Sequence, residues 1–379
     1  MYTKEIIYCL TFGLFFVSTL CWGQSPHVDL WDSAIPYPAL TEIPTATGVT
    51  YSIVHQQTPD HHFLHEPRVT FHGETLFVNF SNAEKNESDP DQKIRGHRSN
   101  DGGRTWNDVE VFAPGFSDSR RHETAPLLSS GNKLWSFVGR YNNGSKNSLG
   151  MELFRLSENG KNFEPFSGEL VLERFIPFVQ PQLLSNGNWI IGGHTEKVRH
   201  AAVAISEGND LTKWKEVKIE TPACSDYPET ALLLQDQNVL AVVRGCPSQR
   251  ALIALSTDFG ETFPPLTESN LPMSQSKPFG GTLSTGQHYL IYNANPSRNT
   301  LVIAVTKPNE LIPLRKVFKV IEGLSASMQQ EFEKIGEKSK INAWAYPEAV
   351  EKNGILYIVF SFNKKHCVLA RIPVESLKY

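Results

Sequence analysis

The sequence predicts an all-β fold in which six repeated units form a ring. Six segments each contain two apolar, β-rich runs joined by a tight-turn signal, the pattern of a β-hairpin. Their turn residues lie 58, 56, 50, 49 and 68 residues apart, at Gly73, Gly131, Gly187, Gln237, Gly286 and Gly354. A short box rich in Asp and Gly follows each of the first four hairpins. Strand repeats of this period are typical of blades stacked around the axis of a β-propeller.

The fourth hairpin, residues 227–244, carries chemistry at its open end. Two apolar runs flank a turn at 236–238, so the two far ends of the hairpin should meet. Tyr227 and Glu229 precede the first run, and Arg244 follows the second. We therefore expect a phenol, a carboxylate and a guanidinium on one rim.

The boxes after the hairpins predict outer turns of the blades. Full copies of the pattern S-x-D-x-G-x-T-aromatic occupy residues 99–106 and 256–263, and degenerate copies occupy 157–163 and 206–214. Asp and Gly favour a turn, and the aromatic residue can pack beneath the blade. We assign these boxes a structural role rather than a substrate contact.

The two ends of the chain should complete the ring. Residues 48–55 predict a strand ahead of the first blade, while the last blade is one strand short. Pairing these segments would close the ring and remove an exposed edge. Residues 25–47, rich in Pro and Ala, predict an arm across the outside. Helix formers over 325–338 predict one helical insertion before the last blade, which explains the long final interval.

The first 23 residues predict a secretory signal peptide. Lys4 precedes an apolar run over 6–20, and cleavage is expected after Gly23. A single propeller domain would then span 24–379. Cys21 raises lipid anchoring as an alternative, but Leu20 before it is a poor match to the small residue that lipid attachment prefers. We expect a secreted or periplasmic protein without a membrane span.

Charge and cysteine content narrow the choice of partners. The net charge of −4 and the lack of a basic run favour neither nucleic acid nor an anionic membrane. Cys224, Cys246 and Cys367 remain after the leader and lack metal-ligand spacing, so we expect no metal and no cofactor. Cys224 and Cys246 bracket the fourth hairpin, which leaves a disulfide or two buried thiols as alternatives.

Candidate site residues lie where inner strands begin or their partners end. Loops at this face of a propeller converge on the axis, and any one polar residue there could simply cap a strand. Many ionisable groups buried without partners would be unfavourable, so their conjunction predicts a solvated, mutually paired funnel. The strand starts offer His65, Glu66, His122, Glu123, Gln180, Tyr227, Glu229, Tyr346 and Glu348, and the strand ends offer Arg140, His194, Arg244 and Arg298.

Six hairpins followed by Asp boxes resemble the six-bladed propeller of the sialidase superfamily. In that family a Glu of the fourth blade activates a Tyr of the sixth blade, which attacks the sugar. Glu229 and Tyr346 each lie eight residues before their turn markers and resemble this pair. The resemblance implies that Tyr346 is a nucleophile and Glu229 its base. Arg244 and Arg298 resemble two of the three arginines that bind the sugar carboxylate.

The first blade departs from the family pattern. The family has Arg-Ile-Pro where this chain has His65-Glu66-Pro67, and Arg68 stands one residue further into the strand. The anion site is therefore incomplete or rebuilt, and Glu66 disfavours ordinary sialic acid. His65 or a carboxylic acid such as Glu66 would donate the proton; the loop after the second strand adds Glu84, Glu87, Asp89 and Asp91. Further substrate contacts are expected from Arg68, His122, Glu123, Gln180 and Tyr227.

The resemblance leads to one main functional hypothesis and two alternatives. The main hypothesis is a secreted, sialidase-like glycoside hydrolase that removes a terminal, acidic sugar from a complex glycan. The first alternative is a propeller lyase that cleaves a uronic-acid glycan by β-elimination, using His65, His122 or His194 with a Tyr. The second is a non-catalytic glycan-binding propeller in which Trp189 or Trp344 stacks on sugar rings.

Overall fold

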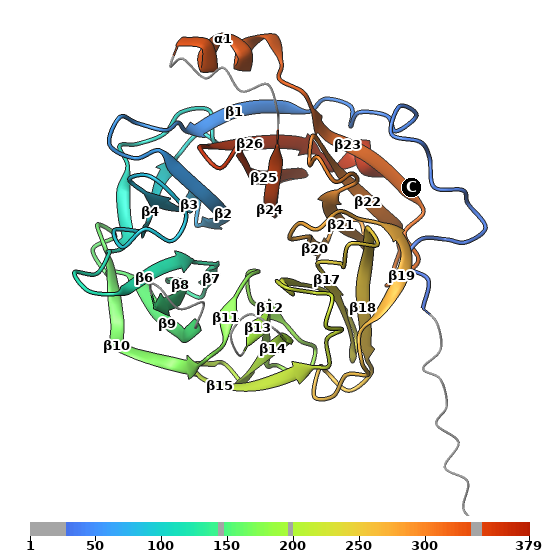
Figure 1. The fold of residues 1–379 in the computed structure, drawn as a ribbon, viewed down its shortest axis with the longest axis horizontal. Helices are drawn as coiled ribbons and strands as arrows, with labels where there is room; N and C mark the ends of the chain where they lie inside the picture. Colours follow the sequence, from blue (N-terminus) through green and yellow to red (C-terminus); the bar gives the residue numbers. More distant parts are fainter. Residues whose placement is uncertain (1–27, 143–147, 196–199, 335–342) are drawn as a thin grey trace, which may run out of the picture.

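The computed structural model describes residues 28–142, 148–195, 200–334 and 343–379. In these residues six antiparallel sheets surround a central axis (Figure 1). The prediction of an all-β, six-bladed propeller is therefore confirmed. The predicted signal peptide, residues 1–23, lies outside the described residues.

In the first blade, successive strands of the chain pair side by side. In the second and third blades, two short strands share the innermost position and both pair with the strand that follows them. The first blade contains β2 (Phe63–His72), β3 (Thr75–Ala83), β4 (Lys93–Ser99) and β5 (Glu110–Ala113). The second contains β6 (Arg120–Thr124), β7 (Leu127–Ser130), β8 (Lys133–Asn142), β9 (Ser148–Leu156) and β10 (Phe163–Glu173). The third contains β11 (Ile176–Pro177), β12 (Gln182–Leu183), β13 (Trp189–Thr195), β14 (His200–Glu207) and β15 (Asp210–Ile219).

Each of the last three blades has four strands in one row, like the first blade. The sixth blade takes its outer strand from the start of the chain. The fourth blade contains β16 (Thr230–Gln235), β17 (Asn238–Val243), β18 (Arg250–Ser256) and β19 (Thr267–Pro272). The fifth contains β20 (Phe279–Thr282), β21 (Gln287–Asn293), β22 (Thr300–Pro308) and β23 (Lys316–Glu322). The sixth contains β24 (Trp344–Lys352), β25 (Ile355–Phe362), β26 (His366–Pro373) and β1 (Thr50–His55).

The sixth blade closes the ring as the sequence predicts. Strand β1 pairs antiparallel with β26, with Tyr51 opposite Ala370, and lies outside it in Figure 1. This pairing joins the start of the propeller to its last strand and covers an edge that would otherwise be open. The preceding arm buries Leu30, Trp31 and Ile43 against apolar residues of the fourth and fifth blades.

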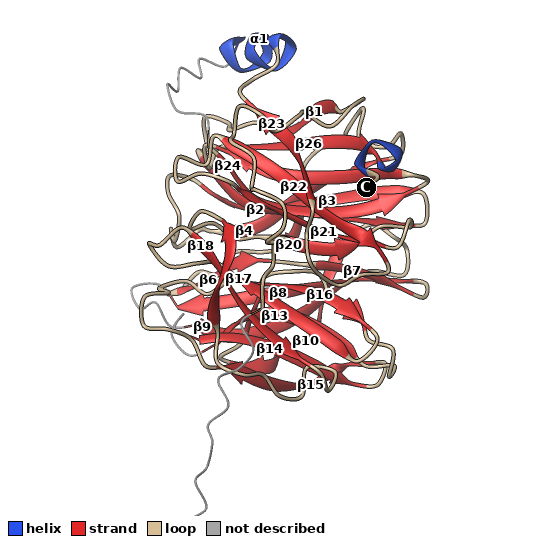
Figure 2. Ribbon diagram, turned by 90° about the vertical axis from the view of Figure 1, so that its right-hand side faces the viewer, coloured by secondary structure: helices blue, strands red, loops and turns tan. Residues whose placement is uncertain are grey.

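The predicted helix is present before the last blade. Helix α1 spans Ala326–Lys334, and residues 335–338 of the predicted segment lie outside the described part of the chain. The Ser325 hydroxyl accepts a hydrogen bond from the Met328 amide and caps the first turn. Figure 2 shows α1 standing beyond the stacked strands at one edge of the molecule. No helix in the described ranges is long and apolar enough to cross a membrane.

The Asp boxes form tight turns between the third and fourth strands of their blades. In the first box, the Thr105 hydroxyl donates to Asp101 at 2.7 Å, and in the box of the fourth blade Thr262 donates to Asp258 at 2.6 Å. Trp106 packs against the apolar cluster between the first and sixth blades. The boxes therefore stabilise the blades locally, as their composition predicts.

Candidate active site

A cavity of about 350 Å³ lies where loops and strand ends of all six blades meet. Its wall combines four basic side chains, four carboxyl groups and an aromatic face. The lining residues are Glu66, Glu87, Ser88, Arg121, Glu123, Tyr141, Phe178, His194, Tyr227, Glu229, Arg244, Arg298, Tyr346 and Lys364.

Tyr346, Glu229 and Arg244 form a hydrogen-bonded group in this wall. The Tyr346 hydroxyl donates to Glu229 Oε1, although the two residues are 117 positions apart in the chain. Arg244 Nη1 donates to both carboxylate oxygens of Glu229, at 3.0 and 3.1 Å, and to the Tyr346 hydroxyl at 3.3 Å. One phenol therefore contacts both a proton acceptor and a fixed positive charge.

The local fold explains why these side chains meet. Glu229 directly precedes β16 and Arg244 directly follows β17, and the Arg244 amide donates to the Glu229 carbonyl at 3.1 Å. That bond closes the open end of the hairpin, so the carboxylate and guanidinium share one rim as predicted. Tyr346 reaches them from β24, at an irregularity in its pairing with β25.

Two residues of the wall occupy the same unusual backbone position in neighbouring blades. Tyr346 has φ 57° and Glu66 has φ 54°, and each precedes a proline at a register shift of its blade. A non-glycine residue in this left-handed region costs about 1–3 kcal/mol and persists where the surrounding structure holds it. A bulge of this kind redirects a side chain out of the regular alternation of a strand. The bulges therefore present Tyr346 and Glu66 to the cavity.

The Tyr346 phenol keeps its proton until a base removes it. Burial raises the pKa of Tyr346 well above its usual value, the Glu229 carboxylate raises it further, and the Arg244 guanidinium opposes both effects. A free phenolate is therefore scarce at neutral pH. The Glu229 carboxylate, which accepts the hydrogen bond of this phenol, is the base in position to take its proton.

Glu66 is an acid that stays protonated at neutral pH. Burial raises the pKa of Glu66 to about 8, and the nearby carboxylates of Glu123, Glu229 and Glu87 act in the same direction. Arg68 opposes this shift from 3.2 Å. The cavity wall thus contains a carboxyl group that can donate a proton.

Among the basic residues of the cavity wall, Arg298 differs in its surroundings. The other three basic residues pair with carboxylates: Arg121 with Glu123, Arg244 with Glu229, and Lys364 with Glu87. Within the described ranges Arg298 has no carboxylate partner, and one amino group donates to the Gln275 carbonyl. A guanidinium in this state favours an anionic group on the ligand.

A second part of the wall is largely aromatic, and its Tyr141 and Phe178 pack in one apolar cluster with Tyr346. Tyr141 lies with its hydroxyl 3.3 Å from His194 Nε2, and the Phe178 ring centroid lies 4.9 Å from that of His194. Burial lowers the pKa of His194 to about 3, so the imidazole is neutral. Arg121 stacks over the Tyr141 ring at 5.0 Å. This wall offers an apolar face with one hydroxyl and one imidazole.

Seven of the eleven residues to which the sequence assigned a catalytic or substrate-binding role line the cavity, and so does His194, a further strand-end candidate. The seven are Glu66, Glu123, Tyr227, Glu229, Arg244, Arg298 and Tyr346. Among the four acidic residues of the loop after β3, Glu87 lines the cavity. Asp89 and Asp91 accept hydrogen bonds from backbone amides of that same loop.

The other four predicted residues lie outside the cavity wall. His65 is buried behind Tyr346, with ring centroids 4.1 Å apart, and Arg68 is buried beside Glu66. His122 contacts Glu152, which also binds Arg140. Gln180 donates at 3.5 Å to the carbonyl of Ala349.

Five lining residues were not selected from the sequence: Ser88, Arg121, Tyr141, Phe178 and Lys364. The sequence could have indicated Lys364, because the turn between β25 and β26 corresponds to the turn between β21 and β22 that carries Arg298. The sequence could also have indicated Arg121, because it stands two residues before Glu123 in β6 and side chains at that spacing point to the same side of a strand. Tyr141 and Phe178 are apolar in pattern, and the sequence does not separate them from core residues.

The two tryptophans considered as sugar platforms pack inside the blades. Trp344 is fully buried and stacks on Phe362 with ring centroids 4.5 Å apart. Trp189 packs against the apolar cluster between the second and third blades. The aromatic face of the cavity comes instead from Tyr141, Phe178 and Tyr227.

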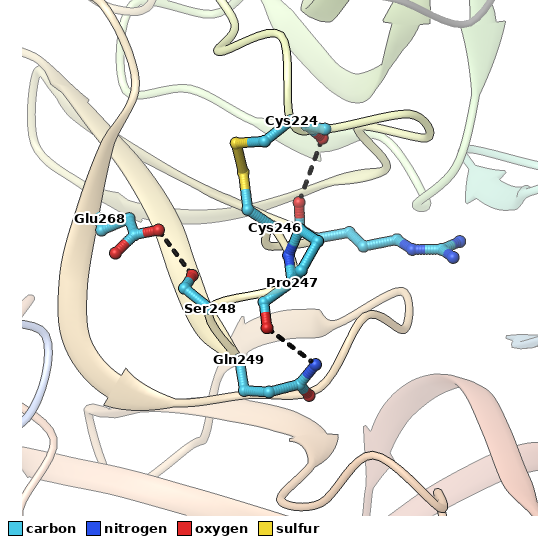
Figure 3. Close-up of a disulfide and its surroundings, with 8 residues drawn as sticks. Cys224, Cys246, Pro247, Ser248, Gln249 and Glu268 are labelled. Atoms are coloured by element: carbon cyan, nitrogen blue, oxygen red, sulfur yellow. Dashed lines mark hydrogen bonds between the residues drawn. A yellow bond between two sulfur atoms is a disulfide. The ribbon is translucent and has the colours of Figure 1, made fainter.

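A disulfide joins the two loops at the open end of the fourth hairpin (Figure 3). Cys224 and Cys246 are bonded, with their Cα atoms 5.3 Å apart. Cys224 precedes Tyr227 and Glu229, and Cys246 lies two residues after Arg244. Of the two alternatives considered from the sequence, the structure therefore shows the disulfide. Cys367 is a buried free thiol.

Replacing both cysteines of this disulfide with serine should reduce stability and loosen the site. Removing a disulfide from a folded domain typically costs about 2–4 kcal/mol, chiefly because the unfolded chain becomes less constrained. We expect a lower Tm and a higher KM, since the rim with Tyr227 and Arg244 loses its covalent tie. Thermal unfolding and steady-state kinetics measure the two effects. Cys367→Ala, which removes the free thiol without burying a hydroxyl, is the control, and a Tm and KM of the double variant equal to those of this control would contradict the expectation.

The fold and the cavity together define the class of protein. A six-bladed ring with Asp boxes and a charged axial cavity is the architecture of the sialidase superfamily. The chain belongs to the BNR repeat-like domain family, which matches residues 74–358. A search of curated proteins found no match. In the described ranges no three His, Cys, Asp or Glu side chains are grouped so that they could hold a metal ion.

Solved structures with the same fold include proteins from three organisms. Trypanosoma rangeli sialidase is 17% identical, with a TM-score of 0.63 over 88% of this chain and 60% of its own. A Dyadobacter fermentans protein of unknown function is 15% identical, with a TM-score of 0.64 over 86% and 99%. The NanB sialidase of Streptococcus pneumoniae is 12% identical, with a TM-score of 0.62 over 86% and 71%. The chain thus spans about three fifths of the trypanosomal sialidase, and the similarity establishes the fold.

Proposed function

We propose that this protein is a glycoside hydrolase that removes a terminal acidic sugar from a complex glycan. The observation that carries the proposal is the contact of Tyr346 with Glu229 and Arg244 in the wall of the axial cavity. A buried phenol bonded to a carboxylate is suited to attack a carbon centre, because its proton has an acceptor in place. A tyrosine also avoids placing a second anion against an anionic sugar.

The reaction would proceed in two steps with defined proton movements. Glu66 gives its proton to the glycosidic oxygen as the bond to the anomeric carbon breaks. Tyr346 attacks that carbon, its proton passes to Glu229, and a glycosyl-tyrosine intermediate forms. In the second step Glu66, now a carboxylate, removes a proton from water, which displaces Tyr346, and Glu229 returns the proton to the phenol. The sugar leaves with its anomeric configuration retained.

The ligand anion would bind near Arg298. This guanidinium lacks a carboxylate partner in the described part of the chain, whereas Arg244 is shared with Glu229 and Tyr346. Arg68 stands close to the family's first arginine in sequence, but its side chain is fully buried against Glu66, Thr124 and Glu348. The anion site therefore depends on fewer free guanidinium groups than the family pattern has.

The predicted leader and the disulfide support action outside the cytoplasm. Disulfides persist in oxidising compartments such as the periplasm and the extracellular medium. The structure contains one between Cys224 and Cys246. We therefore propose an exported enzyme whose substrate is an extracellular glycan.

One observation favours a lyase as the second candidate. Tyr141 and His194 face the same cavity, and the imidazole of His194 is neutral because burial lowers its pKa. The unprotonated imidazole has a lone pair that can take the C5 proton of a uronic acid, but its lowered pKa makes it a weak base; a tyrosine can protonate the departing oxygen. The product would contain a new carbon–carbon double bond.

Product analysis separates these functions. Purified protein is incubated with sialosides, uronic-acid oligosaccharides and their methyl esters. We expect release of a saturated sugar, with the free acid preferred over its ester by about 10- to 100-fold, the range of one or two charge-assisted hydrogen bonds. Arg298→Gln should remove that preference, and Arg315→Gln, which alters an ion pair with Asp32 on the outer arm, should not. Unsaturated product would establish a lyase, and binding without cleavage a glycan-binding protein.

A further inference from the structure

Three fully buried charged residues lie directly behind the two bulges of the cavity wall. Arg68, Lys277 and Glu348 are each 0% exposed. Arg68 Nε lies 3.5 Å from Glu348 Oε2, and Lys277 Nζ lies 4.0 Å from the same oxygen. They come from β2, from the loop before β20 and from β24. None of them lines the cavity, so the proposed chemistry leaves their charges unused.

The two positive charges hold equivalent carbonyl groups. Arg68 Nη1 donates to the carbonyl of Pro67, and Lys277 Nζ donates to that of Pro347, at 3.1 and 2.9 Å. Pro67 follows Glu66, and Pro347 follows Tyr346. Each carbonyl therefore belongs to a bulge that turns a proposed catalytic side chain into the cavity.

Glu348 connects the two bulges. It stands two residues after Tyr346, just as Arg68 stands two residues after Glu66. The Arg68–Glu348 contact thus crosses from the first blade to the sixth at matching positions of their inner strands. Burial lowers the pKa of Lys277 to about 7 and raises the pKa of Glu348 to about 7, so both groups are partly charged near neutral pH. The charge that Glu348 carries is stabilised by Arg68 and Lys277, because a buried charge is unfavourable unless it is paired.

We propose that Arg68, Lys277 and Glu348 are positioning residues that fix the separation between the Glu66 carboxyl and the Tyr346 hydroxyl. The proposal rests on the proposed function, in which these two groups donate the proton and attack the sugar. Lys277 and Arg68 hold the bulge carbonyls, and Glu348 ties the two cations together. The relative position of acid and nucleophile then follows from a buried network rather than from mobile loops.

The charges of these three residues also affect the pKa of Glu66. Arg68 lowers the pKa of Glu66, against burial and against the carboxylates of Glu123, Glu229 and Glu87. Glu348 offsets part of the positive charge of Arg68 and Lys277, which in turn face Glu66 and Glu229. Tyr346 adds a phenol that stays neutral. Removing the Glu348 charge should therefore favour ionised Glu66.

The test compares Glu348→Gln and Lys277→Met with the control Glu110→Gln. Glu110 pairs with Arg98 at 2.6 Å in the same first blade and does not line the cavity. We expect both network variants to lower kcat about 10- to 100-fold with KM within a few-fold of wild type, as for small displacements of reacting groups. In Glu348→Gln the alkaline limb of the pH profile should move to lower pH, and in Lys277→Met it should not.

Crystal structures give a readout that does not depend on activity. In the network variants we expect a changed distance between the Glu66 carboxyl carbon and the Tyr346 oxygen. An unchanged distance together with wild-type kcat and pH profile would overturn the positioning role. Lys277→Met supplies the test if Glu348→Gln does not fold. A wild-type protein that hydrolyses no glycoside would contradict the proposed function instead, and the distances would still decide the positioning role.

Discussion

Replacing Tyr346 with phenylalanine is expected to reduce kcat for glycoside hydrolysis by at least about 10³-fold, because removal of a nucleophile closes the covalent route. The substitution deletes one oxygen and leaves the ring in place against His65. Glu229 keeps its ion pair with Arg244, so the carboxylate is not left unpaired. We therefore expect the fold and the binding of substrate to persist. Initial rates, a binding isotherm and thermal unfolding measure these three properties.

Two further variants make the interpretation of this result specific. Glu229→Gln should lower kcat by a comparable factor, and the double variant should be no slower than the worse single variant, since the residues act as a unit. Tyr357→Phe is the matched control, because Tyr357 packs against Phe71 away from the cavity. Activity retained by Tyr346→Phe would show that another group attacks the sugar, with the Tyr141 and His194 pair as the next target.

Replacing Glu66 with glutamine should give the second largest effect. For glycosides with poor leaving groups we expect kcat to fall by about 10²- to 10⁴-fold, the usual contribution of a positioned general acid. Aryl glycosides with acidic leaving groups need little protonation, so their bond cleavage should slow far less. Stopped-flow or steady-state rates on both substrate types measure the contrast.

The pH profile gives an independent check on Glu66. Because burial raises its pKa to about 8, wild-type activity should fall as pH increases through 8 and the acid loses its proton. Glu66→Gln cannot ionise, so its residual activity should lack this limb. Glu87→Gln is the comparison, since Glu87 lines the cavity from the loop after β3. If Glu87→Gln shows the leaving-group dependence and Glu66→Gln does not, the proton donor lies on that loop.

The spacing of the hairpins predicted most of the fold. Turn residues such as Gly73 and Gly354 mark hairpins that the structure confirms, and the strand over 48–55 completes the last blade as expected. These features could be predicted because turn-forming residues and alternating apolar residues act over only a few neighbouring positions of the chain. Ring closure follows from the need to cover the remaining strand edge.

Part of the site was also accessible from the sequence. Equal offsets from the turns, together with the resemblance to sialidases, selected Glu229 and Tyr346, and the structure brings them into contact. Repetition is the reason, since equivalent positions in a ring of blades converge on one axis. The same reasoning did not distinguish His122 and Gln180, which start inner strands yet lie outside the cavity wall.

Other features depended on the tertiary structure alone. Arg68 follows the segment that corresponds to the family's Arg-Ile-Pro, but its side chain is buried against Glu348 and does not line the cavity. Glu66 occupies the wall instead, because a bulge with φ 54° turns it toward the axis. Side-chain direction at a bulge depends on backbone geometry that residue types do not reveal.

The repeat pattern thus predicted the number of blades and the closing strand, and the resemblance to sialidases selected Tyr346 and Glu229. The tertiary structure decided which charges face the cavity, that Arg298 lacks a carboxylate partner in the described ranges, and that Arg68, Lys277 and Glu348 meet behind the wall. The two kinds of feature differ in the distance along the chain over which their causes act. Strand and turn preferences act between neighbours, whereas the pairing and burial of charges depend on groups that the chain brings together from blades far apart in sequence.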